Sequence, residues 1–399
     1  MDKVEFIISP KALIIGFEHP YNAIQMMADR IAAALVEQGY APATAMIGNE
    51  NLPDQLSAIN DPSLELIIFL GSIPLNLQVN KMHIWRFIPK SVKCIEIILD
   101  SLPYDFRIPG FVNYLNDFTT SPNYHLASFE GNIAKTLTEF TGKNVFHLHH
   151  GAYTIAQKTS PKKHPDRLMF WGSIGAELGR NDATDDLLST LTQFNVWGLN
   201  KERLSYTADA MKASDNFYGY SELSNALDIS LQNLLRPEWI QALCAIDSAL
   251  KRYRRLFLIE SILDFPLDIY GKNWEQYLPK KSDIRIMNFI PDDNSVFSYA
   301  CQEYAGVVNI DPNWGNGTNE RAITALALGV NVASNKNEMI KDIHGHYPYV
   351  LDRQSIRDAC KLALDTKNVL SDLPQFSWSA VIKKLLIECA GQERHHFTP

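Results

Sequence analysis

The sequence lacks the features of a secreted or membrane-spanning protein. Its 399 residues include only five cysteines, scattered without a CxxC pair, which predicts free thiols in a reducing compartment rather than disulfides. No apolar run approaches the ~20 residues that span a bilayer. An early acidic residue and Pro10 break the N-terminal apolar segment, which argues against a secretory signal. We therefore expect a cytoplasmic protein without an integral membrane segment, and peripheral membrane association stays open.

Basic residues are too few for a general nucleic-acid surface. The chain has 37 Lys and Arg against 45 Asp and Glu, a formal net charge of -8, so we expect no nucleic-acid partner. Internal repeats and low-complexity tracts are lacking as well. What the chain does have is 46% hydrophobic and 11% aromatic residues, the composition of a folded globular protein. Its length predicts two or three domains.

Apolar runs of strand length alternate with helical patterns along the chain. The strand candidates are typical of buried parallel strands. They are residues 11–17, 64–71, 92–100, 144–151, 167–173, 265–271, 284–291, 304–311 and 329–334. Amphipathic helices are expected at residues 22–40, 354–367 and 377–391. The alternation predicts an α/β protein whose parallel sheets carry helices on both faces, an arrangement present twice.

The polar, proline-containing segment 156–166 is the best linker in the chain. It separates an N-terminal Rossmann-like domain, residues 1–155, from a second one, residues 165–376. The second domain carries a mostly helical insertion at about residues 181–262. Residues 377–399 contain a closing helix that we expect to pack back on the N-terminal domain.

Ligands of doubly wound sheets bind beyond the carboxyl ends of the strands. Four loops of the second domain in such positions carry polar or aromatic residues. They are Gly172–Ser173, Gly271 with Trp274, residues 288–291 and residues 311–321. We expect the principal site of the protein at these loops.

The loop at residues 311–321 is the most informative of them. Thr318 or Asn319 is placed to cap the helix that follows, and Glu320 and Arg321 occupy its first turn. Free amides and the helix dipole suit a phosphate or diphosphate there, and Arg321 adds positive charge. Glu320 can accept hydrogen bonds from sugar hydroxyls, so the pair fits a nucleotide-sugar. In the alternative interpretation, both residues only stabilise the helix end.

Three segments resemble the donor-binding half of group 1 glycosyltransferases, closest to the spore-maturation (CgeB-type) branch. In chain order they are FWGSIGAELGR, LDIYGKNWEQY and VVNIDPNWGNGTNERAITALALGVNVAS. The resemblance covers about residues 165–355 and implies a GT-B architecture, in which two Rossmann-like doubly wound domains face each other across a cleft. The first domain would take the acceptor and the second the activated sugar.

The same resemblance implies the chemistry. The donor would be a nucleotide-sugar, with a UDP-sugar as the first expectation, and no other cofactor would be needed. Metal is not expected, because helix amides and basic side chains can stabilise the departing diphosphate, and the lack of an Asp-x-Asp motif agrees with this. Most relatives retain the configuration of the sugar, so we expect retention.

The resemblance also assigns site residues. Those expected beside the diphosphate are Gly172, Ser173 and Arg180, and those expected near the base are Gly271 and Trp274. Those expected to hold the diphosphate and the sugar at the helix mouth are Thr318, Asn319, Glu320 and Arg321.

Two positions depart from the family pattern. Group 1 enzymes often carry glutamates that contact the transferred sugar and the ribose, and here these positions are Asn316 and Thr324. Neither is a carboxylate. Glu320 lies one turn before Thr324 on the same helix face and is the candidate substitute.

Histidines and basic residues elsewhere offer further candidates. His19, in the loop after the first strand, is the candidate general base toward an acceptor hydroxyl, because a histidine pKa lies near neutrality; a structural loop histidine is the alternative. Trp274 can equally be a core residue. His147 and His149 share one side of a strand as a metal pair would, but with no carboxylate or cysteine nearby we expect a hinge. The run Lys251–Arg255 is expected to be a solvated helix face rather than a phosphate contact.

These observations predict a glycosyltransferase that transfers a sugar to a glycan, protein or small-molecule acceptor, with His19 and Glu320 as catalytic residues. Two alternatives stay open. A nucleotide-sugar epimerase of the same architecture would form its product without an acceptor. A non-catalytic binding or assembly subunit would explain Asn316 and Thr324.

Overall fold

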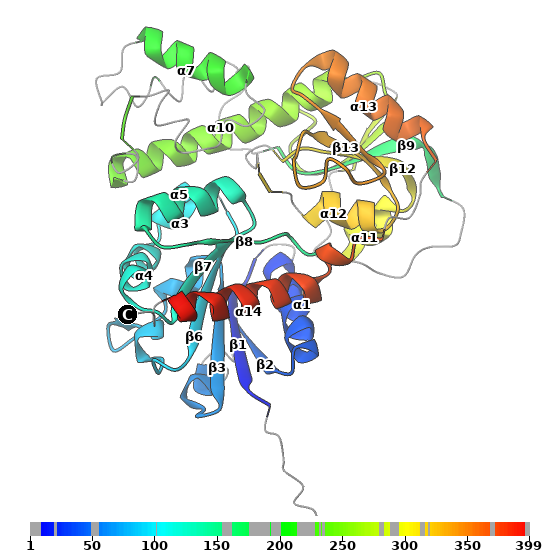
Figure 1. Ribbon diagram of the computed structural model, residues 1–399. Helices are drawn as coiled ribbons and strands as arrows, with labels where there is room; N and C mark the ends of the chain where they lie inside the picture. Colours follow the sequence, from blue (N-terminus) through cyan, green and yellow to red (C-terminus); the bar gives the residue numbers. More distant parts are fainter. Residues whose placement is uncertain are drawn as a thin grey trace, which may run out of the picture.

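A computed structural model shows two α/β domains joined by a long helix and a returning C-terminal helix (Figure 1). The residues that the structure describes are 9–19, 22–48, 56–100, 102–153, 162–174, 192, 201–213, 228–230, 233, 236–278, 283–287, 295–311, 316–317, 320–367 and 372–395.

The N-terminal domain is a six-stranded parallel sheet in the order β2-β1-β3-β6-β7-β8. Its strands are β1 (Lys11–Phe17), β2 (Ala41–Ile47), β3 (Leu64–Leu70), β6 (Lys93–Ile98), β7 (Tyr124–Ser128) and β8 (Phe146–His147). Its helices are α1 (Ala23–Glu37), α3 (Leu102–Phe106), α4 (Pro109–Thr120) and α5 (Gly131–Thr141). Along β1, Leu13 and Ile15 enter one core and Ala12 and Ile14 the other. The sheet is therefore covered on both faces, as its continuous apolar strands predict.

The C-terminal domain has a second six-stranded parallel sheet, in the order β11-β10-β9-β12-β13-β14. Its strands are β9 (His164–Trp171), β10 (Leu267–Tyr270), β11 (Ile284–Ile286), β12 (Tyr304–Asn309), β13 (Asn331–Asn335) and β14 (His346–Tyr349). Its helices are α11 (Ser295–Cys301), α12 (Glu320–Ala327) and α13 (Arg353–Asp365), whereas α7 (Lys201–Ala213) contacts α10 and places Ala208 and Met211 in the N-terminal core. Counted from β9, the strand order is 3-2-1-4-5-6, that of the Rossmann fold. The predicted fold class, two doubly wound parallel-sheet domains, is confirmed.

Two helices connect the domains (Figure 1). Helix α10 (Pro237–Ser261) contributes Trp239 and Leu243 to the N-terminal core, while Leu258 and Ile259 in its last turns enter the C-terminal core. Helix α14 (Trp378–His395) runs back across the N-terminal sheet beside α1, with its apolar side in the core of that domain. Motion of one domain relative to the other must therefore bend or shift packed helices.

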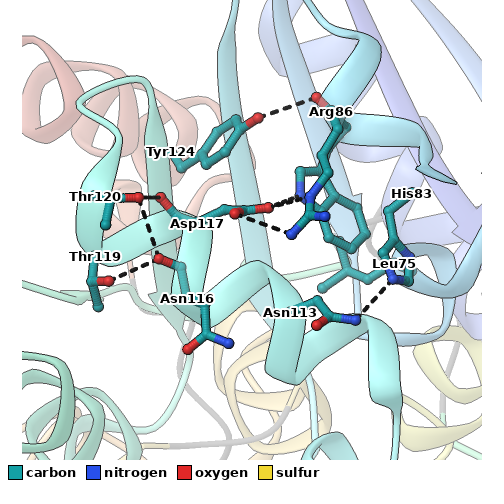
Figure 2. Close-up of polar contacts among 10 residues, drawn as sticks. Leu75, His83, Arg86, Asn113, Asn116, Asp117, Thr119, Thr120 and Tyr124 are labelled. Carbon is teal, nitrogen blue, oxygen red and sulfur yellow. Dashed lines mark hydrogen bonds and ion pairs between the residues drawn. The ribbon is translucent and has the colours of Figure 1, made fainter.

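Polar contacts tie the segment between β3 and β6 to α4 (Figure 2). The Arg86 guanidinium donates to both carboxylate oxygens of Asp117, at 2.7 and 3.2 Å. The His83 ring lies between the carbonyl of Leu75 and the side-chain amide of Asn113, each at 2.9 Å. One ring nitrogen therefore donates while the other accepts, which satisfies a buried imidazole.

Several sequence predictions are refined. All five cysteines are free and buried, as predicted. Residues 164–166 of the predicted linker instead open β9, and the predicted strand 284–291 is a strand only at 284–286 among its described residues. Among the helices of the described residues, none is long and apolar enough to cross a membrane.

Candidate functional site

Loops at the carboxyl ends of the two sheets enclose a cleft of about 680 Å³ between the domains. From the N-terminal domain it is lined by Phe17 at the end of β1, His19 after β1, Gly71 and Ser72 after β3, Leu99 and Asp100 after β6, Phe129 after β7 and His150 after β8. From the other side it is lined by Lys251 and Arg255 of α10, Asp311 after β12, and Glu320 and Arg321 of α12. The cleft thus lies where doubly wound sheets bind their ligands.

Two arginines converge on the carboxyl end of β9. Arg321 Nη1 donates to the carbonyl of Trp171, and Arg255 Nη1 donates to the carbonyl of Ser173 at 2.6 Å. A side chain at Gly172 would lie 3.6 Å from Arg321 Nη1. Burial and the nearby charge of Arg321 lower the pKa of Arg255 to about 10. Two like charges held this close favour an anion between them.

The sequence did not predict the part that α10 plays here. Arg252 and Arg254 are 3% and 2% exposed, so the expected solvated face at Lys251–Arg255 is wrong. Lys251 lines the cleft and pairs with Asp247 at 2.8 Å. Both ends of the basic run, Lys251 and Arg255, therefore line the cleft, while Arg252 and Arg254 between them are buried.

Gly271 and Trp274 pack against the backbone of Gly172, just after β9. Trp274 is 0% exposed, and its Nε1 donates to the carbonyl of Gly172 at 2.7 Å. A Cβ on Gly271 would lie 2.1 Å from that same carbonyl oxygen. Trp274 is thus a core residue, the alternative that the sequence left open, and it packs edge-on against Phe170. Ser173, by contrast, uses its hydroxyl to accept a hydrogen bond from the amide of Lys272 at 3.0 Å.

Glu320 faces a histidine of the N-terminal domain across the cleft. His150 Nε2 lies 3.8 Å from Glu320 Oε2, and His150 Nδ1 is 3.0 Å from the carbonyl of Gly151. The hydrogen therefore sits on Nδ1, and a lone pair on Nε2 points to the cleft side. Burial lowers the pKa of His150, although Glu320 opposes the shift. The Glu320 side chain is 30% exposed and that of His150 is 3% exposed, so the carboxylate is accessible to a ligand and the neutral imidazole is nearly buried beside it.

His150 was missed by sequence reasoning, although it belongs to the HLHH run. The alternation along the strand singles out His147 and His149 instead. Burial, His149 and Lys384 lower the pKa of His147 to about 4. Among the described residues, no group of three or more His, Cys, Asp or Glu side chains could hold a metal ion.

His19 is exposed at the cleft and contacts the Phe17 ring edge-on at 6.1 Å.

The two positions that depart from the family pattern both contact the N-terminal domain. The Thr324 hydroxyl accepts a hydrogen bond from the amide of Tyr153 at 2.9 Å. The amide of Asn316 donates to Glu130 Oε1 at 2.8 Å, and its carbonyl accepts from the amide of Gly131 at 2.7 Å. These contacts join the two domains and are not contacts of the kind expected for donor binding. Both residues hold the domains together beside the cleft.

The wall opposite the arginines carries carboxyl groups. The Ser72 hydroxyl donates to Asp105 Oδ1 at 2.6 Å and lies 3.3 Å from Glu96 Oε1. Burial, above all, raises the pKa of both carboxyls well above the usual range. Both walls carry both signs of charge, with Asp105 beside Arg107 on the N-terminal side and Asp311 and Glu320 beside the basic residues on the other, but most of the basic side chains belong to the C-terminal wall. Arg180, Thr318, Asn319 and residues 288–291 lie outside the described residues.

No protein-family model and no curated protein sequence matches the chain. Solved structures do. T4 phage BGT in complex with its UDP-glucose substrate matches with 10% identity over 97% of this chain and 98% of that one, at a TM-score of 0.46. An α-glucosyltransferase in complex with UDP and a 13-mer DNA matches with 8% identity over 95% and 99%, at a TM-score of 0.52.

A UDP-N-acetylglucosamine 2-epimerase matches with 9% identity over 96% of each chain, at a TM-score of 0.40. At such identities the similarity concerns the fold alone. The chain thus shares its whole-length architecture, two Rossmann-like domains around a cleft, with proteins of the GT-B type.

Proposed function

We propose that the protein is a glycosyltransferase that uses a nucleoside-diphosphate sugar, with uridine as the first candidate base. One observation carries the proposal: Arg255 and Arg321 stand beside the Glu320–His150 pair in a single interdomain cleft. The arginines suit a diphosphate, because guanidinium groups bind phosphate oxygens in a fixed fork geometry. The carboxylate and imidazole suit the hydroxyls of a sugar attached to it.

The residues account for the steps of the transfer. An acceptor hydroxyl attacks the anomeric carbon, the bond from that carbon to the diphosphate oxygen breaks, and its electron pair leaves with the diphosphate. Arg255 and Arg321 stabilise the charge that develops there. His19, exposed on the acceptor side of the cleft, takes the proton of the attacking hydroxyl. Glu320 and His150 Nε2 accept hydrogen bonds from the sugar and orient it. Positive charge from the chain itself supports transfer without a metal ion. A single displacement with His19 as the base inverts the anomeric carbon. Retention, which the family resemblance implies, instead requires attack on the face that the diphosphate leaves, with a diphosphate oxygen taking the proton.

A binding or assembly subunit is the second candidate. Its support is that Asn316 and Thr324, where group 1 enzymes often carry glutamates, serve the domain interface. An epimerase would use the same cleft without an acceptor. The three proposals predict different products, so one experiment separates them.

The test is turnover with a panel of nucleotide-sugars, with and without acceptors. Oligosaccharides, small hydroxylated molecules and duplex DNA belong in the panel, the last because a protein of the same fold was crystallised with DNA; the net charge of -8 predicts no transfer to it. A transferase releases nucleoside diphosphate in an acceptor-dependent way. Product without acceptor indicates an epimerase. Tight nucleotide binding with no turnover on any combination favours the binding subunit.

A further inference from the structure

Helix α5 of the N-terminal domain begins where the loop that leads into α12 crosses the domain interface. Glu130 caps α5, and its Oε2 accepts from the amide of Ile133 at 2.7 Å. Its other oxygen, Oε1, accepts from the amide of Asn316, which belongs to the opposite domain. One buried carboxylate therefore joins two backbone segments that are 186 residues apart along the chain.

The backbones of residues 129–131 and 316–317 lie too close together to admit a side chain at either glycine. The amide of Gly131 donates to the carbonyl of Asn316, and Glu130 and Gly317 form a β-bridge. A Cβ on Gly317 would lie 2.3 Å from the carbonyl oxygen of Phe129. A Cβ on Gly131 would lie 2.4 Å from Asn316 Nδ2. Two glycines thus permit the close approach that the carboxylate secures.

The clamped loop is directly connected to the proposed donor site. Gly317 is three residues before Glu320, and its carbonyl also accepts from Asn337 Nδ2 of the C-terminal domain. The loop is therefore held from both domains just before the turn that carries Glu320 and Arg321. Only two residues separate Gly317 from Glu320, and each residue spans at most about 3.3–3.6 Å. We therefore expect a displacement at residue 317 to shift the start of α12.

We propose that Glu130 is a positioning residue for the donor site, which it acts on by clamping residues 316–317 across the domain interface. This inference rests on the proposed function, because it concerns the affinity of the same site for a nucleoside diphosphate. Donor binding and domain docking are then coupled: a ligand held by Arg321 favours the clamped loop, and loss of the clamp weakens the ligand. Glu130 is 1% exposed, and this burial raises its pKa to about 7.

The test compares Glu130→Gln and Gly317→Ala with a matched control. The amide side chain of Glu130→Gln keeps the size but offers one acceptor oxygen instead of two, and Gly317→Ala forces the backbones apart from the other side. Asp352→Asn is the control, because Asp352 caps α13 on the surface of the C-terminal domain by accepting from the amide of Ser355 at 2.9 Å. The probe is whichever of UDP, TDP, GDP and ADP binds the wild-type chain most tightly.

Two readouts separate positioning from a merely structural role. Hydrogen exchange at the amides of Gly131 and Asn316 reports the clamp itself, without ligand. Calorimetric titration reports the dissociation constant of the nucleoside diphosphate. We expect faster exchange and about 10-fold weaker binding in both clamp variants, with the Asp352→Asn affinity within about twofold of wild type.

Three results would overturn the inference. Unchanged exchange in both variants means that Glu130 holds no clamp. Faster exchange with unchanged affinity means that the contact is structural only. No binding of any of the four nucleotides to the wild-type chain removes the proposed function and the positioning role with it, while the exchange result still reports on the interface.

Discussion

Arg255 should lower the stability of the unliganded protein while raising its affinity for a nucleoside diphosphate. Its pKa falls from 12.5 to about 10 because it is buried and faces the charge of Arg321. A difference of this size corresponds to about 3 kcal/mol against the charged form. Part of the side chain meets water in the cleft, so screening reduces the expected strain to about 1–2 kcal/mol.

The substitution Arg255→Gln tests this directly. Glutamine removes the charge, and its amide nitrogen lies two bonds short of the Nη1 position, so the hydrogen bond from Arg255 to the carbonyl of Ser173, at 2.6 Å, is lost. We expect the free energy of unfolding to rise by about 1 kcal/mol, after the loss of one charged hydrogen bond is deducted. The affinity for a nucleoside diphosphate should fall about 10- to 100-fold, since charged hydrogen bonds to a ligand contribute about 1.5–3 kcal/mol.

Denaturant unfolding and calorimetric titration are the two assays. Arg357→Gln serves as the matched control, because Arg357 forms an exposed ion pair with Asp264 at 2.5 Å. It should change stability by no more than about 1 kcal/mol and leave nucleotide affinity unchanged. A destabilised Arg255→Gln protein that binds nucleotide as tightly as wild type would refute the reasoning, since Arg255 would then be a structural residue only.

Three further predictions follow from the same contacts. Glu320→Gln should lower turnover by about 100-fold yet leave the nucleoside-diphosphate affinity within about threefold of wild type, because the proposed contact of Glu320 is with the sugar. Kinetics measures the turnover and titration measures the affinity; equal losses in both would contradict this role. Glu130→Gln should flatten the pH dependence of stability. In wild type the pKa of this carboxyl is raised from 4.5 to about 7 in the native state, so the native protein keeps the proton at pH values where the unfolded chain loses it. The free energy of unfolding of wild type therefore falls as pH rises from about 4.5 to 7. The fall is at most about 3 kcal/mol, and urea titrations at several pH values measure it. Gly271→Ala should cost about 1–3 kcal/mol in thermal unfolding, because its Cβ would lie 2.1 Å from a carbonyl oxygen; an unchanged melting temperature would show that the turn yields.

The doubly wound fold could be predicted because buried parallel strands leave a distinctive apolar signature. Strands β1, β3 and β6 are such runs. Strand β2 was not predicted, because its sequence, APATAMI, combines Ala, Pro and Thr and lies half exposed at the sheet edge. Strand β7, YHLAS, contains polar residues that are buried by the helices around it rather than by any local pattern.

The site was predictable only in part. The loop before Glu320 and Arg321 was found because a turn followed by a helix start has a local signature. Arg255 was assigned to a solvated helix face and His150 was not predicted, because their position in the cleft depends on how the two domains face each other, which no local sequence period encodes. The same holds for Asn316 and Thr324, whose partners lie more than 170 residues away in the chain.

The most direct test of the central claim is calorimetric titration of UDP, TDP, GDP and ADP into the wild-type protein and into the Arg255→Gln/Arg321→Gln double variant. The proposed donor site predicts that at least one nucleotide binds wild type at a one-to-one ratio, and that the double variant loses this binding while remaining folded. Failure of all four to bind wild type, or equal binding to both proteins, would contradict the assignment of a nucleoside-diphosphate site between Arg255 and Arg321.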